Sequence, residues 1–303
     1  MYKSPITIEA LQVLDTIDRR GSFAAAAEQL NKVPSALSYI VQKLEEQLAV
    51  TLFVRQGRRS VLTPAGRHLL EEGRKVLGAV SKLTEQTQTI SHGWEPKINI
   101  TFDSIFDMQL LLAPLAQFLQ EHPNIEIDLN EEVMNGSWEA LIEDRTDLLI
   151  AAPEPVPNQQ GISVIALDNL KQVFVVPKGH ELASFQSPVN KSEIDNYRTV
   201  IVHDSAKNAI PWSSNIIEQS RHFYVSAVEH KIQAIVAGIG VGYLPKSRIQ
   251  PQLASGALVE VELNEAEKIS GIYLAWKTVN KGKGLKRLKE IMQQHLDSAS
   301  STL

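Results

Sequence analysis

The chain has 303 residues, of which 43% are hydrophobic and 21% charged, a composition typical of globular proteins with room for two or three domains. It contains no cysteine, which excludes disulfides, thiolate metal sites and a cysteine nucleophile, and which suits a reducing cytosol. The N-terminus lacks a long apolar run, and no stretch reaches the roughly 18 apolar residues of a membrane helix. We therefore expect a cytoplasmic protein without a signal peptide or membrane span.

The net charge of −5 is unevenly distributed along the chain. Residues 1–92 carry 12 Lys and Arg against 9 Asp and Glu, whereas the remainder carries 18 against 26. Between residues 52 and 82 there are seven basic residues and two acidic ones. Such a local excess of positive charge indicates contact with a polyanion, although most charged runs are simply solvated faces.

Three helices are predicted near the N-terminus from the spacing of apolar residues, over 7–19, over 23–30 and from Pro34 onward. Ser22 is a typical N-cap, and Pro34 fits a first helical position, where its missing N–H costs nothing. The short turn between the second and third helices predicts a helix-turn-helix. The third helix carries an outward stripe of polar residues, made up of Ser35, Ser38, Tyr39 and Gln42.

A β-hairpin is predicted next, because the apolar segments 52–54 and 60–62 flank a turn that contains glycine. This hairpin would be the wing of a winged helix-turn-helix. Arg55, Arg58 and Arg59 would then lie beside phosphates or in the minor groove. A solvated basic loop is the alternative.

The N-terminal segment resembles the DNA-binding domain of the LysR-type transcriptional regulators across its length. The matching residues are Gly21-Ser22-Phe23, Ala26-Ala27, Leu30, Ser35-Ala36-Leu37-Ser38, Leu44-Glu45, Leu52-Phe53, Arg55 and Thr63-Pro64-Ala65-Gly66. The resemblance implies binding to double-stranded promoter DNA, with the third helix in the major groove. The residues expected to contact DNA are Pro34, Ser35, Ser38, Tyr39, Gln42, Lys43, Arg55, Arg58 and Arg59.

The third helix departs from the family pattern at several positions. Val33-Pro34 stands where the family usually has a polar pair, and Tyr39 stands where it usually has arginine. Tyr39 and Pro34 can contact a thymine methyl group, but they cannot form the bidentate guanine contact of an arginine. We therefore expect DNA binding with a different base preference.

A long helix is predicted from Thr63-Pro64 to about residue 92. Its apolar residues alternate in steps of four and three, which suits a pairing helix, although packing against the chain's own core is the alternative. In the LysR family the matching helix mediates dimerisation, so the resemblance implies a homodimer that assembles to a homotetramer through the regulatory domains. The residues assigned to dimerisation are Leu69, Val76, Val80, Leu83 and Ile90.

From Lys97 onward, predicted strands and helices alternate, which is typical of an α/β domain with a mainly parallel sheet. The pattern resembles the effector-binding region of LysR-type regulators, whose two α/β subdomains are similar to periplasmic binding proteins. The predicted fold is therefore multidomain, with an all-α winged helix-turn-helix and linker helix before a two-subdomain effector-binding region. The predicted boundaries are 1–63, 64–92 and 93–303, with 97–168 and 268–297 in subdomain I and 169–267 in subdomain II.

Acidic residues are concentrated early in this region, with twelve acids and two bases over residues 97–154. Four of these acids follow predicted strand ends, where the ligand cleft of such a fold lies, and aromatic residues are close by. Because a cation in a cleft needs carboxylates and gains from aromatic faces, we predict a cationic effector, such as an amine, diamine or cationic drug. The assigned effector-binding residues are Phe102, Asp103, Ser104, Glu131, Glu132, Trp138, Glu154 and His203.

Several alternatives remain open at this stage. The acids can lie on the exterior, and an anionic or aromatic metabolite is expected instead if Lys171, Lys207 or Lys231 reaches the cleft. An enzyme-like α/β domain fused to a DNA-binding domain and an architectural DNA-binding protein are the competing function classes.

No cofactor, metal site or enzymatic activity is expected from the motifs. The glycines of 238–242 follow a predicted helix and precede a strand, the reverse of the order in a dinucleotide-binding loop. The eight histidines lack metal-ligand spacing. Promoter DNA and a small-molecule effector that changes promoter contacts are the expected partners, and RNA polymerase is a further candidate.

Overall fold

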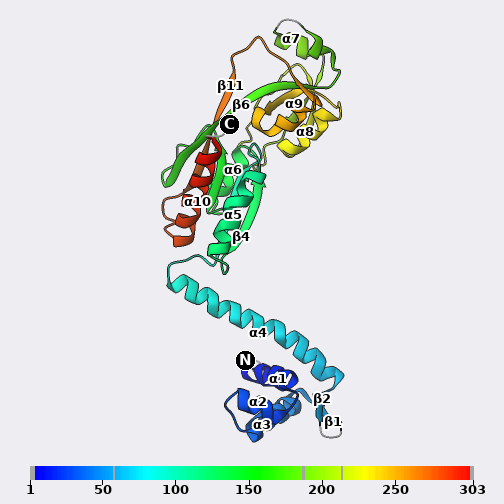
Figure 1. Ribbon diagram of the computed structural model, residues 1–303, viewed down its shortest axis with the longest axis vertical. Coiled ribbons are helices and arrows are strands. Elements are labelled where there is room, and N and C mark those ends of the chain that lie inside the picture. Colours follow the sequence, from blue (N-terminus) through cyan, green and yellow to red (C-terminus); the bar gives the residue numbers. More distant parts are fainter. Residues whose placement is uncertain (1–3, 57–58, 186–187, 213, 301–303) are drawn as a thin grey trace. The chain divides into compact units, whose positions relative to one another are not determined.

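The computed structural model describes residues 4–56, 59–185, 188–212 and 214–300. The chain forms two compact units, Met1–Ser91 and His92–Leu303, and Figure 1 labels many of their elements. None of the described helices combines the length and the apolar character that crossing a bilayer requires.

The N-terminal unit is a winged helix-turn-helix. Its elements are α1 (Ile8–Arg20), α2 (Phe23–Gln29), α3 (Pro34–Leu48), β1 (Phe53–Gln56), β2 (Arg59–Leu62) and α4 (Pro64–Ser91). Thr7 caps α1 by accepting a hydrogen bond from the Ala10 amide at 3.1 Å, and Gly21 ends that helix with a φ of 73°. Leu14 and Leu37 are completely buried between the helices. The helices and hairpin predicted from the apolar spacing are confirmed.

Helix α4 is packed against its own unit only over its first turns. Gly73 is buried against Leu11, and a Cβ at that glycine would lie 2.7 Å from Leu11 Cδ2. Arg74 forms ion pairs with Asp15 at 2.7 Å and with Asp18 at 2.8 Å, both on α1. Beyond Gly73, no residue of α4 is buried in the described chain. The apolar side chains of its second half therefore face solvent in the single chain.

The C-terminal unit is an α/β domain. Its first elements are β3 (Lys97–Asp103), α5 (Gln109–Glu121), β4 (Glu126–Glu132), α6 (Asn135–Ile142), β5 (Leu148–Pro153), β6 (Ile162–Pro177), the 3-10 helix η1 (Glu181–Ser184) and α7 (Lys191–Ile194). Its later elements are β7 (Arg198–Val202), β8 (Arg221–Val225), α8 (Val228–Val236), β9 (Gly242–Pro245), the 3-10 helix η2 (Lys246–Ile249), α9 (Gln250–Ala254), β10 (Leu258–Glu260), β11 (Lys268–Lys277) and α10 (Lys283–Ser300).

The main sheet is mixed, so the expectation of a mainly parallel sheet is wrong. Its strands are ordered β10-β6-β11-β5-β3-β4, and β9 also pairs with β6. Strand β3 pairs in parallel with β4 and β5, whereas every pairing of β6 and β11 is antiparallel. The returning strand β11 enters between β5 and β6, a long-range pairing that leaves no mark in the local sequence pattern.

Two lobes share this sheet. The first lobe contains β3 to β5, α5, α6 and α10, and the second contains β7 to β10 with α7, α8 and α9. Strands β7 and β8 pair in parallel as a separate two-stranded sheet. Strand β6 runs through both, because it pairs with β11 from Ile162 to Gln172 and with β9 and β10 from Gln172 to Pro177. Strand β11 also pairs with β5 and leads into α10, so the chain returns to the first lobe as the resemblance implied.

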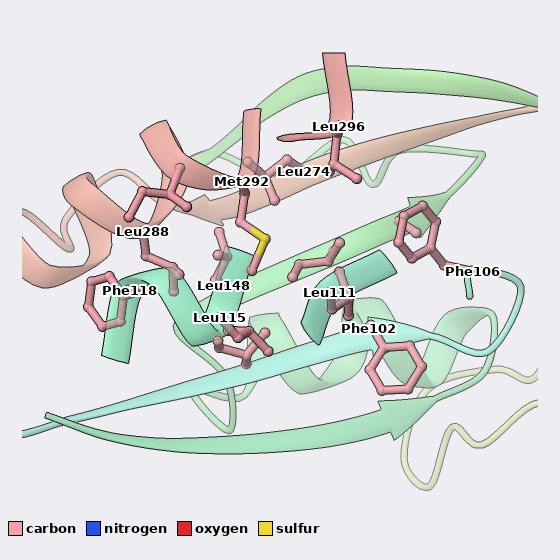
Figure 2. Close-up of a cluster of buried hydrophobic side chains, with 14 of the residues drawn as sticks. Phe102, Phe106, Leu111, Leu115, Phe118, Leu148, Leu274, Leu288, Met292 and Leu296 are labelled. Atoms are coloured by element: carbon pink, nitrogen blue, oxygen red, sulfur yellow. The ribbon is translucent and has the colours of Figure 1, made fainter. Parts of the chain in front are cut away.

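The core of the first lobe lies between the sheet and the helices α5 and α10 (Figure 2). Leu111 and Phe118 of α5 meet Leu288 and Met292 of α10 there, next to Leu148 of β5. Each helix places one apolar stripe on this core, because residues spaced by three, four or seven lie on the same helical face. This packing fixes the sheet edge from which the cavity residues of the first lobe project.

Candidate DNA-binding surface and effector cavity

Helix α3 presents one buried and one exposed face. Leu37, Val41 and Leu44 are buried, whereas Tyr39 is 63% exposed. All six residues of this helix that were predicted to contact DNA are exposed: Pro34, Ser35, Ser38, Tyr39, Gln42 and Lys43. The exposed face thus offers hydroxyl, amide, aromatic and ammonium groups to a groove.

The polar groups of this face are held by bonds within the helix. Ser38 Oγ donates a hydrogen bond to the Pro34 carbonyl at 3.0 Å, and Gln42 Nε2 donates one to Glu46 Oε1 at 3.1 Å. Arg55, on the hairpin strand β1, is also exposed. Arg58 lies outside the described residues, and so does the side chain of Arg59.

A cavity of about 530 Å³ in the C-terminal unit has walls from both lobes. Val133 and Met134 line it from the first lobe, and Val202 and Leu244 line it from the second. Trp212 adds an aromatic wall. The volume and the mostly apolar walls suit a small organic molecule.

Hydrogen bonds join the two lobes around this cavity. Ser104 Oγ accepts a hydrogen bond from the Val228 amide at 2.7 Å, and Arg248 Nη1 donates one to the Ser104 carbonyl at 2.8 Å. The Asp204 carboxylate accepts a hydrogen bond from the Gly136 amide at 3.0 Å. These contacts bring the first turn of α8 against the end of β3.

Lys231, on α8, lines the cavity and is only 5% exposed. Its ammonium forms no hydrogen bond or ion pair with a described residue. Burial, and after it the charge of Lys268, lowers the pKa of Lys231 to about 7. The cavity therefore contains a buried amine that is partly protonated at neutral pH and has no ion-pair partner among the described residues.

Two family models match this chain. The bacterial regulatory helix-turn-helix protein model of the lysR family matches residues 8–67, and the LysR substrate binding domain model matches residues 91–297. This chain belongs to the LysR family of transcriptional regulators. The division of the two models agrees with a DNA-binding unit followed by an effector-binding unit.

Relatives from Escherichia coli strain K12 support the same assignment. The regulator is 35% identical over 269 residues to the HTH-type transcriptional regulator YeeY, covering 89% of this chain and 87% of YeeY. It is 36% identical over 277 residues to the probable HTH-type transcriptional regulator YhaJ, covering 91% of this chain and 92% of YhaJ. Both relatives are named as transcriptional regulators.

Solved structures share the fold at low sequence identity. A mutant of OxyR from Corynebacterium glutamicum aligns with a TM-score of 0.64 at 19% identity, covering 99% of this chain and 95% of that one. The full-length regulator LysG from the same organism, with bound effector arginine, aligns with a TM-score of 0.53 at 17% identity, covering 97% and 99%.

Two of the eight predicted effector-binding residues, Asp103 and Glu154, line the cavity of the regulator. Phe102 does not, because strand alternation turns it into the core of the first lobe while its neighbour Asp103 faces the cavity. Trp138 is completely buried beside β5, where its Nε1 donates a hydrogen bond to the Pro153 carbonyl at 2.8 Å. Ser104 is buried and already bonded to the amide of α8.

The remaining three lie away from the cavity lining. Glu131 and Glu132 were expected after the second strand, but β4 extends through both of them. Glu131 is exposed, and Glu132 forms an ion pair with Arg145 at 3.0 Å. His203 is exposed and stacks on Tyr224 with ring centroids 4.6 Å apart. The expected convergence of four acids on the cleft is therefore wrong.

Most of the acidic excess is used inside the fold. Glu139, which is buried, accepts hydrogen bonds from the amides of Lys207 and Asn208 at 2.7 and 2.6 Å, and these backbone bonds lower its pKa. Asp147 accepts one from the Asn99 amide at 2.8 Å. These carboxylates hold loops in place. The number of acidic residues in the segment 97–154 therefore does not indicate how much negative charge the cavity contains.

The effector-binding residues predicted from the sequence do not include Lys231. This residue was named only as one of three lysines that would favour an anionic effector if they reached the cleft. The spacing of apolar residues does indicate an inward position for Lys231. The first, fourth, fifth and eighth residues of α8 share one helical face, and they are Val228, Lys231, Ile232 and Ile235. A lysine at an inward position of such a stripe marks a buried cation. Among the described residues, there is no group of His, Asp and Glu that could hold a metal ion.

Asp103 is held by three donors at the cavity wall. Its Oδ2 accepts hydrogen bonds from the Met134 amide and Ser137 Oγ, both at 2.7 Å, and its Oδ1 accepts one from the Ile105 amide at 3.0 Å. Burial raises the pKa of Asp103 to about 7 in spite of these donors. The carboxyl therefore titrates near neutrality while fixing the loop between β4 and α6.

The Asp103→Asn variant should change how stability depends on pH. Because the folded-state pKa of about 7 exceeds the ordinary 3.8, the folded chain keeps a proton that the unfolded chain releases, and the free energy of unfolding falls as pH rises through this window. The variant lacks that component, so its stability relative to wild type should rise by up to roughly 4 kcal/mol across the window. Urea unfolding at several pH values measures this. Parallel profiles would contradict the assignment of a protonated buried carboxyl.

Proposed function

We propose that this LysR-type regulator binds promoter DNA through α3 and the hairpin, and changes its promoter contacts when a small-molecule effector occupies the cavity. The observation that carries the proposal is the cavity of about 530 Å³ with walls from two lobes. A ligand that touches both lobes binds one lobe arrangement more tightly than others and so shifts their populations. We further propose that the regulator works in the cytoplasm, with RNA polymerase as a partner at the promoter.

On the DNA-binding surface, the exposure of the α3 stripe supports direct base contacts. Tyr39 is the most informative residue, because its ring offers an apolar contact to thymine methyl groups. Lys43 Nζ lies 5.9 Å from the centre of that ring, so the two side chains form one surface. Pro34, Ser35, Ser38 and Gln42 complete the proposed groove contacts, and Arg55, with Arg58 and Arg59, is proposed to contact phosphates.

For assembly, we propose a homodimer through α4 that forms a homotetramer through the effector-binding units. Val76, Leu83 and Ile90 support this, because they are 46%, 63% and 60% exposed in the single chain and recur at heptad spacing. Val80 lies on the same stripe. Leu69 packs partly against its own domain core, so its contribution to the dimer is the smallest.

A cationic effector is the competing proposal for the charge of the ligand. Asp103 and Glu154 support it, since both line the cavity. Both carboxyls already accept hydrogen bonds, however: Asp103 has three donors, and Glu154 Oε1 accepts one from Tyr273 Oη at 2.8 Å. An anionic effector, the other hypothesis raised by the sequence, has Lys231 in its favour.

Effector sensing should be visible as ligand-dependent stability. A panel of metabolites and drugs should contain compounds that raise the melting temperature of the full chain and alter its affinity for promoter DNA, without turnover of the compound. Ser270→Trp, which fills the cavity, should abolish the response, and its exposed neighbour Ile269→Trp is the matched control. Equal stabilisation of wild type and Ser270→Trp would place the ligand elsewhere.

Replacing Tyr39 with alanine should change the base preference of the regulator. Each lost base contact is worth roughly 1–3 kcal/mol of discrimination, which selection from random DNA measures. Arg55→Ala is the comparison: it should weaken binding to all sequences alike and reduce the salt dependence by about one counterion. An unchanged preference in Tyr39→Ala would mean that another face of the unit reads the bases.

A charge on the exposed stripe of α4 should abolish dimers. Leu83→Glu would bury an unpaired carboxylate in the proposed seam, so dimer formation and operator affinity should be lost together. Ser81→Glu adds the same charge to the same helix off the stripe and should leave both intact. Light scattering and DNA titration measure the two effects. A Leu83→Glu protein that stays dimeric with full affinity would disprove this seam.

A further inference from the structure

The cavity contains one titratable side chain, that of Lys231, without a hydrogen-bond or ion-pair partner among the described residues. Lys231 projects from the inward face of α8, between the buried residues Val228 and Ile232. No described residue accepts a hydrogen bond from its ammonium. Removing a cation from water without a partner is costly, so burial favours the neutral amine, and an anion that pairs with the ammonium favours the charged form.

The fold also makes room for this side chain. Gly242, on β9, lies against the lysine stem, and a Cβ at that glycine would lie 3.1 Å from Lys231 Cε and 3.4 Å from Nζ. The end of the lysine side chain therefore lies against this strand at the cavity wall.

Every other charged group near the cavity has partners. Lys268 Nζ lies 3.7 Å from the centre of the Tyr243 ring, donates a hydrogen bond to Asn215 Oδ1 at 3.2 Å and pairs with Glu265 at 3.8 Å. Asp103 and Glu154 accept hydrogen bonds from within the first lobe and β11. Among the titratable groups that line the cavity, Lys231 is therefore the one without a hydrogen-bond partner in the described chain.

Three neutral polar side chains that line the same cavity form no hydrogen bond with a described residue. They are the amide of Gln172 on β6, the hydroxyl of Ser214 and the hydroxyl of Ser270 on β11. All three can donate to an oxyanion, and apolar side chains such as Val133, Trp212 and Leu244 line the same cavity. The cavity thus offers one amine that can become cationic, three neutral donors and apolar walls.

We propose that the effector is an organic anion with an apolar body, whose carboxylate or other oxyanion pairs with the ammonium of Lys231. This inference rests on the proposed effector-sensing function and specifies its ligand. The apolar body packs against Trp212, Val133 and Leu244, and the charged end lies toward α8 and β9.

Binding of such an anion is linked to proton uptake. With a pKa of about 7, the ammonium of Lys231 is only partly protonated in the empty cavity at neutral pH, and a paired anion raises that pKa. The affinity for an anion that is ionised throughout should therefore fall about ten-fold between about pH 6 and about pH 8. Asp103 titrates in the same range and faces the same cavity, so its contribution is separated with Asp103→Asn.

The test uses two matched series on the full chain: phenylacetate, phenylacetamide and phenethylamine, and hexanoate, hexanamide and hexylamine. Ligand-detected NMR at millimolar concentrations ranks them, and calorimetry in buffers of different ionisation enthalpy measures proton uptake. We expect a carboxylate to bind at least ten-fold more tightly than its amide and amine. Lys231→Met, which retains the volume and removes the charge, should abolish that preference, whereas the exposed Lys207→Met should retain it.

Each outcome decides the assignment. Carboxylate preference with proton uptake that survives in Asp103→Asn and disappears in Lys231→Met supports the proposal. Preference for the amine, equal binding by Lys231→Met, or no saturable binding of either carboxylate overturns it. A preference for the amine would contradict the anionic ligand but not effector sensing. Failure of the sensing function would be seen in a different result, namely ligand responses that Ser270→Trp does not change.

Discussion

The antiparallel ladder between β6 and β11 is the constraint on which the effector-binding unit depends. It runs from the pair Ile162–Lys277 to the pair Gln172–Lys268, and β6 continues beyond it into the second lobe. The pairing continues along this ladder with one register shift between Ile272 and Tyr273, so backbone hydrogen bonds support the chain where it passes between the lobes. Gln172 and Ser270 belong to this ladder, and the cavity therefore has a wall that neither lobe supplies alone.

The electrostatic effect of a charged residue in this molecule depends more on its hydrogen-bond and ion-pair partners than on how many such residues a segment contains. The segment 97–154 is strongly acidic, yet Glu139 and Asp147 accept backbone amides, and Glu132 pairs with Arg145. One lysine without a counter-charge, Lys231, matters more to the cavity than these acids. The reason is electrostatic screening. Solvated or paired charges produce only a weak electrostatic field, whereas a buried, unpaired ion is weakly screened and carries the full free-energy cost of desolvation.

The two units divide recognition between an exposed and an enclosed surface. The DNA-binding unit buries the inward apolar face of α3 and presents Tyr39 and Arg55 to solvent, where a large polyanion can reach them. The effector-binding unit contains a cavity, and an enclosed surface of this kind suits a small molecule. Helix α4 belongs to the first unit through Gly73 and Arg74, and the solvent-facing stripe beyond them supports pairing with a second copy.

The sequence by itself determined the DNA-binding unit, because its signals are local. Apolar spacing, the Ser22 cap and Pro34 at the start of α3 all act within a few residues, and the outward face of α3 follows from helical periodicity. The alternation of strands and helices likewise indicated the α/β unit.

Only the tertiary structure decided which groups meet in the cavity. Asp103, Lys231 and Ser270 are distant in sequence and come together through the antiparallel insertion of β11 and the packing of α8, which no local pattern encodes. A shift of one strand position separates Phe102 in the core from Asp103 in the cavity, and the extension of β4 through Glu132 removed two predicted ligands, because strand ends and facing depend on pairing partners rather than on composition.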